Sequence, residues 1–110
     1  MLHPVIPYAC RGIIWYQGEA NANRPAEYAQ SFPLWLNLLR KRWERKDLHL
    51  MAVMLPGYGK DNGHPTAKSW ARFRDAQMKI LALPGTSVVN TIDLGDKKNI
   101  HPSDKAPICK

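Results

Sequence analysis

Short apolar runs and amphipathic segments alternate along this chain. Residues 12–16 are apolar throughout, which predicts a short buried strand. Residues 48–55 form a second apolar run of strand length, closed by a Pro-Gly pair. Residues 86–92 are rich in β-branched side chains and predict a third strand.

Two segments between these strands have helical periodicity. The first face consists of Tyr28, Phe32, Trp35, Leu36, Leu39 and Trp43. Pro33 interrupts this segment, so Ser31 is expected to cap a helix that restarts at Phe32, with Pro33 in its first turn. The second face consists of Trp70, Phe73, Gln77, Ile80 and Leu81, and it ends before Pro84 and Gly85.

The resulting order of strand, helix, strand, helix and strand predicts an α/β fold. Connections of this length suit right-handed crossovers between adjacent parallel strands, with helices packed on the sheet. A length of 110 residues fits one domain, so residues 1–110 are expected to form a single domain. In such sheets, functional groups gather beyond the carboxyl ends of the strands.

Polar side chains stand at two of these strand ends. Gln17, Gly18 and Glu19 follow the first strand directly, and residues 93–101 follow the third. Glu19 and His101 are therefore expected to meet at one edge of the sheet. A carboxylate that holds an imidazole is the orienting half of a nucleophilic triad, and the Gln17 amide is a candidate donor to an oxyanion.

The charge of the chain raises the question of a nucleic-acid partner. The formal net charge is +7, and much of it lies in residues 40–46, at the end of the first predicted helix. Basic residues there complement the helix dipole, and neither an RNA-binding sheet pattern nor a helix-turn-helix spacing is present. We expect no nucleic-acid partner. The rival interpretation, a basic nucleic-acid-binding or structural protein, depends on Arg40, Arg42 and Arg45.

A second rival is a carbohydrate-binding module without chemistry. The segment 56–66 is rich in Gly, Pro and Asn, which predicts an exposed loop. With Trp15, Tyr16 and Tyr58, this loop is a candidate for holding a sugar by stacking. Saturable glycan binding that does not depend on His101 and Glu19 favours this interpretation.

The cysteines and the apolar runs give only limited information about the cellular compartment of the chain. Cys10 and Cys109 stand at opposite ends without a ligand-like spacing, so two free thiols and no metal site are expected. The longest apolar run is far shorter than the ~20 residues that span a bilayer, so we expect no membrane span. The opening residues lack a basic n-region and contain two prolines, unlike a signal peptide, and the compartment stays open.

Three sequence blocks, GIIWYQGEAN, WARFRDAQ and TIDLGDKKNIHPSDK, occur in this order. They resemble the sialate O-acetylesterase and acetylxylan esterase branch of the SGNH (GDSL-like) hydrolases, over essentially the whole chain. The resemblance implies a flavodoxin-like three-layer α/β sandwich with a parallel sheet. It also implies a serine esterase that removes O-acetyl groups from sialic acid or other carbohydrates, without a metal or organic cofactor.

The resemblance also assigns roles to residues. His101 matches the histidine that precedes a proline and acts as general base. Glu19 and Gln17 match the acidic and amide positions of the WYQGE block, as partner of the histidine and as oxyanion or substrate donor. Lys98 and Asn99 stand where many relatives have Asp, so Glu19 takes the acidic role by elimination, with Asp96 as the alternative.

The serine nucleophile is the second departure from the family. No Gly-Asp-Ser or Gly-Gln-Ser block occurs in the 110 residues. The serines present are Ser31, Ser69, Ser87 and Ser103, and none is predicted at a strand-to-helix elbow. We expect the chain to be the C-terminal portion of an esterase domain that begins at an internal Met. Such a βαβαβ portion is expected to show no turnover alone and to self-associate through an exposed sheet edge.

Overall fold

The structure, a computed structural model, describes residues 3–6, 8–59, 65–101 and 104–109. Its strands are β1 (Gly12–Trp15), β2 (His49–Val53) and β3 (Thr86–Val89). Its α-helices are α1 (Pro25–Arg42) and α2 (Pro65–Met78). Short 3-10 helices follow as η1 (Glu19–Asn21), η2 (Lys79–Ala82) and η3 (Ala106–Cys109). The predicted order of elements is confirmed, with strands shorter than the apolar runs that predicted them.

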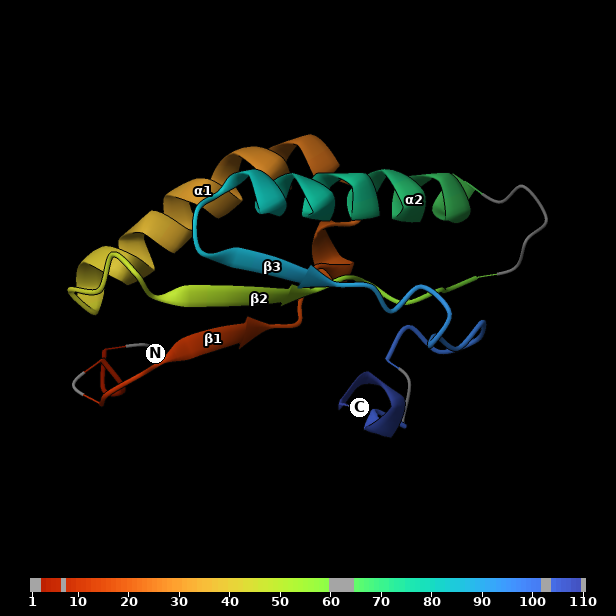
Figure 1. The fold of residues 1–110 in the computed structure, drawn as a ribbon. Helices are drawn as coiled ribbons and strands as arrows, with labels where there is room; N and C mark the ends of the chain where they lie inside the picture. The colour runs from red at the N-terminus through yellow and green to blue at the C-terminus, as the bar shows by residue number, and fades with distance from the viewer. Residues whose placement is uncertain (1–2, 7, 60–64, 102–103, 110) are drawn as a thin grey trace.

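The three strands form a parallel sheet in the order β1-β2-β3. Both helices lie on the same face of this sheet (Figure 1), as expected when two crossovers of the same hand proceed in one direction. The predicted α/β class is confirmed. The described chain contributes the sheet and one helical layer of the predicted sandwich.

The core lies between the sheet and the two helices. Leu36 of α1, Phe73 of α2 and Leu50 of β2 are fully or almost fully buried there. Burying a side chain of this size stabilises the fold by roughly 1.5–3 kcal/mol. Burial alternates between Leu50 and Met51 of β2, because successive side chains of a strand point to opposite faces of the sheet. Leu50 is buried, and Met51 is exposed.

Helix α1 corrects one detail of the sequence prediction. It runs without a break from Pro25 to Arg42, and Pro33 lies inside it. Ser31 does not cap a second helix; its hydroxyl donates to the Tyr28 carbonyl oxygen at 3.4 Å. The predicted restart is wrong because Pro25 already occupies the first turn, where a proline fits well. Burial of one face of the helix stabilises it by more than the loss of the one backbone hydrogen bond at Pro33 costs.

The face of the sheet opposite the helices carries exposed apolar side chains. Ile14 of β1 is 75% exposed, and its neighbour Met51 of β2 is 36% exposed. Within the described chain, β1 and β3 each have one unpaired edge. The predicted self-association through a free edge stays a prediction, and it depends on these surfaces.

Two further observations concern the cysteines and the apolar character of the helices. Cys10 is a free thiol whose sulfur donates to the Gly12 carbonyl oxygen at 3.0 Å. The side chain of Cys109 lies outside the described part of the chain. Of the helices in the described residues, none combines the length and apolar character needed to cross a membrane.

Candidate active site

The turn after β1 explains why an apolar strand leads straight into polar residues. Gly18 has a backbone φ of 154° and packs against the ring of Phe73 from α2. A Cβ at this position would overlap that buried ring, so only glycine fits here. The close packing directs the chain into η1, and Gln17 and Glu19 stand on either side at the carboxyl end of β1.

Glu19 and His101 lie together at this edge. The Glu19 Oε1 atom is 3.7 Å from His101 Nδ1, although 82 positions separate the residues in sequence. The other carboxylate oxygen accepts from the Gly18 N–H at 3.1 Å, which fixes the side chain. Glu19 is 18% exposed and His101 is 70% exposed. A distance of 3.7 Å exceeds a hydrogen bond, as is common at catalytic sites without substrate.

The loop that carries His101 is held by side chains of its own. The Asn99 Oδ1 atom accepts from the His101 backbone N–H at 2.9 Å, and Asp96 Oδ1 accepts from the Lys98 N–H at 2.8 Å. These are Asx-type turns. Asn99 therefore positions the backbone of His101. Among the described residues, Glu19 is the carboxylate within ion-pair distance of the imidazole, and Asp96 is not.

Asp93 does not cap this loop, although a side chain of its type is suited to do so. The Ile92 N–H instead donates to Asn90 Oδ1 at 3.0 Å. Asp93 makes no hydrogen bond within the described residues and lines a pocket. The Asn90 side chain forms the cap because it lies two residues before the Ile92 N–H.

Gln17 is held by a partner that the sequence did not reveal. Its Nε2 atom donates to Asn21 Oδ1 at 2.9 Å. An amide nitrogen carries two protons, so one N–H remains for a substrate oxygen. The signal in the sequence is the spacing of four residues between the Gln17 and Asn21 amides. This spacing predicts a contact only when the turn through η1 is known.

Three of the four serines, Ser31, Ser69 and Ser87, lie in the described part of the chain. Ser31 is exposed on α1, and Ser69 lies on α2. Ser87 lies within β3, where its hydroxyl is 3.0 Å from His49 Nε2 on the face without helices. Ser103 lies outside the described residues. Among those described, no serine contacts His101.

The aromatic residues proposed as a sugar platform do not form one surface. Trp15 stacks on Trp35 with ring centroids 4.2 Å apart, against the helical layer. Tyr16 lies under the Lys105 amine, 5.0 Å from its ring centre. Tyr58 is in contact with Trp70 instead. Part of the loop that was to complete the platform, residues 60–64, lies outside the described chain.

Behind the turn, Tyr28 of α1 is buried in the core. This burial raises the pKa of its hydroxyl, and the negative charge of Glu19 acts in the same direction. Tyr28 therefore stays neutral at physiological pH and adds no negative charge beside the Glu19 carboxylate.

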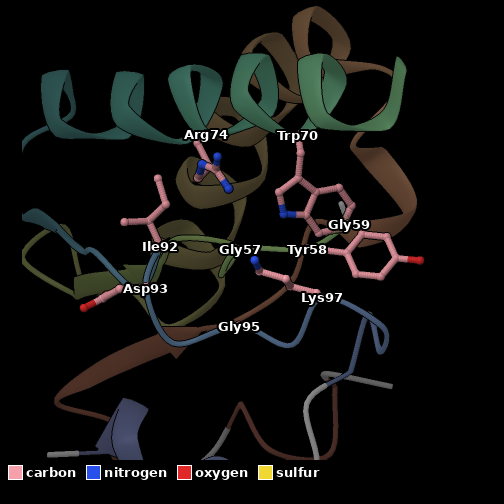
Figure 2. Close-up of a pocket in the computed structure, with 9 residues that line it drawn as sticks. All are labelled: Gly57, Tyr58, Gly59, Trp70, Arg74, Ile92, Asp93, Gly95 and Lys97. Atoms are coloured by element: carbon pink, nitrogen blue, oxygen red, sulfur yellow. The ribbon is translucent and has the colours of Figure 1, made fainter. Parts of the chain in front are cut away.

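A pocket of about 400 Å³ opens beside this site, at the carboxyl ends of β2 and β3. Figure 2 shows the residues that line it: Gly57, Tyr58, Gly59, Trp70, Arg74, Ile92, Asp93, Gly95 and Lys97. The Gly57 N–H donates to the Ile92 carbonyl oxygen at 3.0 Å, and Gly95 packs directly on the Gly57 backbone. Sequence reasoning missed this pocket because its walls come from three separate segments.

The comparison with known protein families identifies the family of the chain. A family model described as carbohydrate esterase, sialic acid-specific acetylesterase, matches residues 3–108. The chain belongs to this family of carbohydrate esterases. The predicted membership of the esterase branch is thereby confirmed.

Individual relatives of this esterase family agree. The chain is 26% identical to the sialate O-acetylesterases of Homo sapiens and Pongo abelii over 125 aligned residues, which cover 98% of the chain and 24% of each relative. A carbohydrate acetylesterase from Xanthomonas citri matches with a TM-score of 0.87 and 34% identity, over 98% of this chain and 26% of that one. The chain thus spans about a quarter of the length of these esterases.

Proposed function

We propose that this chain forms the histidine-bearing part of the active site of a carbohydrate O-acetylesterase. The observation that carries the proposal is the 3.7 Å approach of Glu19 Oε1 to His101 Nδ1 at the carboxyl edge of the sheet. His101 acts as general base and Glu19 as its orienting partner. The nucleophilic serine comes from residues outside these 110, as part of a domain to which the chain contributes its C-terminal portion.

The reaction follows from the two nitrogens of the imidazole. Glu19 faces Nδ1 and holds the proton there, which leaves Nε2 free to take the proton of a serine hydroxyl. The serine oxygen attacks the acetyl carbon, and Gln17 donates its remaining N–H to the oxyanion. Collapse of this intermediate breaks the ester bond, and the imidazolium returns the proton to the leaving sugar oxygen. Water then repeats the sequence and releases acetate.

The substrate class rests on the family. The relatives are named for sialate and for carbohydrate acetyl esters, which supports an acetylated carbohydrate as substrate. The rival nucleic-acid function is not favoured, because Arg40 uses its donors on backbone carbonyls. A non-catalytic sugar platform is not favoured either, because its aromatic side chains are separated.

A chimera tests the proposal. Residues 3–108 replace the matching quarter of the Xanthomonas citri acetylesterase, which supplies a serine-bearing remainder. We expect acetyl release from acetylated sugars, and His101→Ala should lower kcat by at least roughly 10³-fold, as for loss of a triad base. Glu19→Gln should have a smaller effect in the same direction.

The matched control is His49→Ala, which removes an exposed imidazole at the opposite end of the sheet. It should leave kcat unchanged. Turnover by the chimera that survives His101→Ala would contradict the proposal. Acetyl release by the isolated chain, lost on His101→Ala, would show that the nucleophile lies within it.

A further inference from the structure

The Gln17 side chain is held by Asn21, and both residues belong to the turn after β1. The Gln17 Nε2 atom donates to Asn21 Oδ1 at 2.9 Å, and both residues are half-buried. Among the described residues, no second partner orients the Gln17 amide. The direction in which this amide points therefore depends on the Asn21 side chain.

The backbone around η1 holds Asn21 in place for this contact. The Asn21 N–H donates to the Gly18 carbonyl oxygen at 2.8 Å, and the Asn21 carbonyl oxygen accepts from the Arg24 N–H at 2.7 Å. Gly18 is fixed in turn by its close packing on the Phe73 ring. The Asn21 side chain thus projects from a backbone that is hydrogen-bonded on both sides, which is the kind of support that a precisely placed donor needs.

A glutamine is a poor oxyanion donor unless its amide is oriented. The side chain turns about several bonds, and it loses much conformational freedom when it is fixed. Its amide also carries an acceptor oxygen beside the donor nitrogen, and that oxygen repels an oxyanion. Donation to Asn21 Oδ1 orders the Gln17 side chain before substrate arrives and determines which end of the amide is the nitrogen.

The same turn also carries the partner of the histidine. The Gly18 N–H donates to Glu19 Oε2 at 3.1 Å, and Glu19 Oε1 lies 3.7 Å from His101 Nδ1. The turn therefore orders two side chains through separate hydrogen bonds, Glu19 for proton transfer and Gln17 for the oxyanion. Loss of the Asn21 contact should affect the second function and spare the first.

We propose that Asn21 is a positioning residue for the oxyanion donor Gln17. The inference rests on the proposed esterase function and adds a residue that acts through Gln17 rather than on the substrate. Donors stabilise an oxyanion most when they are oriented before the charge develops. Because the oxyanion forms only after attack on the ester, Asn21 should act on kcat and have little effect on KM.

The order of the Gln17 amide in the 110-residue chain tests the contact without turnover. The readout is ¹H–¹⁵N NMR of the side-chain amides, with the exposed Gln30 as the reference for a mobile amide. The Gln17 amide should be ordered in the wild type, as mobile as Gln30 in Asn21→Leu, and ordered in Asn21→Asp, which keeps the acceptor oxygen. A mobile Gln17 amide in the wild type, order that survives Asn21→Leu, or order lost in Asn21→Asp would overturn the assignment.

Turnover by the chimera tests the consequence for catalysis. Asn21→Leu should lower kcat roughly tenfold, as for loss of one hydrogen bond, and leave KM and the pH profile unchanged. Gln17→Ala should lower kcat by roughly 10²-fold or more, as for loss of an oxyanion donor. The double variant should be no slower than Gln17→Ala, because Asn21 has nothing left to position.

The matched control is Asn23→Leu, which replaces an exposed asparagine two residues further along the chain. It should leave kcat unchanged, and equal thermal midpoints among the variants exclude unfolding as the cause. Unchanged kcat in Asn21→Leu or in Gln17→Ala would overturn the assignment. A double variant roughly tenfold slower than Gln17→Ala would also overturn it, because Asn21 would then act independently of Gln17.

Failure of this inference and failure of the proposed function give different results. If turnover by the chimera is lost in His101→Ala but unchanged in Asn21→Leu, the esterase function stands and the role of Asn21 is wrong. If Asn21→Leu releases the Gln17 amide but His101→Ala leaves turnover unchanged, the contact stands and the catalytic proposal is wrong.

Discussion

Two arginines at opposite ends of the sheet differ in how their charge is used. At the amino end, Arg40 of α1 donates to the carbonyl oxygens of Leu48, Pro84 and Gly85, at distances of 2.6–3.3 Å. At the carboxyl end, Arg74 of α2 donates to none of the described residues. The first arginine ties the starts of two strands to a helix. The second one has a buried Nη1 atom without a partner among the described residues.

The difference separates the end of the sheet where an arginine holds backbone segments together from the end that carries Glu19 and His101. The basic cluster around Arg40 gives the chain much of its positive charge, yet the guanidinium of Arg40 donates through Nε and Nη2 to backbone carbonyl oxygens. Arg74 looks ordinary in sequence, on a helix that also contains exposed charges. Hydrogen-bond satisfaction, rather than net charge, distinguishes the two.

The largest effect on stability is expected at the carboxyl end, from Gly18→Ala. The added methyl group overlaps the buried ring of Phe73 at a positive φ, so we expect a loss of about 2–3 kcal/mol in the free energy of unfolding. Denaturant titration measures this loss. Gly12→Ala is the control: its Cβ would meet the His49 carbonyl oxygen at 3.2 Å, which requires only a small shift. Equal losses for both variants would contradict the role given to Gly18.

A smaller effect is expected at the amino end, from Arg40→Ala. Its charge-assisted hydrogen bonds to carbonyl oxygens contribute about 2 kcal/mol, and their removal should lower the urea midpoint. Lys41→Ala, an exposed neighbour on the same helix, should leave the midpoint nearly unchanged. Equal midpoints for Arg40→Ala and Lys41→Ala would contradict the role given to Arg40.

The smallest effect is a pH dependence at the amino end. Arg45, through a hydrogen bond of 2.7 Å, lowers the pKa of Asp47 from 3.8 to about 2. A lowered pKa in the folded state stabilises the protein above about pH 4, and this contribution is lost as the pH falls through about 2. Unfolding midpoints should fall slightly more over this range in the wild type than in Asp47→Asn. An identical decline in both would show that the exposed pair contributes nothing.

The strands, the helices and the edge of the sheet at which Glu19 and His101 meet could be predicted from the sequence. Apolar runs locate β1 to β3, but the prediction that the first strand is buried is wrong for the described chain, in which β1 has no buried residue and one face of the sheet is uncovered. The meeting of Glu19 and His101 follows from the rule that parallel strands end at one edge. The continuity of α1 was not predicted, because local sequence rules treat Pro33 as a break and do not include the tertiary packing that holds the helix together.

The pocket around Arg74 could not be predicted, because it depends on how three segments approach one another. The packing of Gly95 on Gly57 brings the loops after β2 and β3 together. The sequence shows two glycines in separate loops and no sign of their contact. Whether an arginine on a helix has a partner is likewise a property of the folded chain.

The most direct test of the central claim is the tautomer of His101, observed through the imidazole nitrogens by long-range ¹H–¹⁵N NMR of the 110-residue chain. With Glu19 beside Nδ1, the neutral ring should carry its proton on Nδ1 and leave Nε2 free, and Glu19→Gln should shift the ring toward the other tautomer. A ring that is protonated mainly on Nε2 in the wild type, or a tautomer that Glu19→Gln does not change, would contradict the pairing on which the proposed mechanism depends.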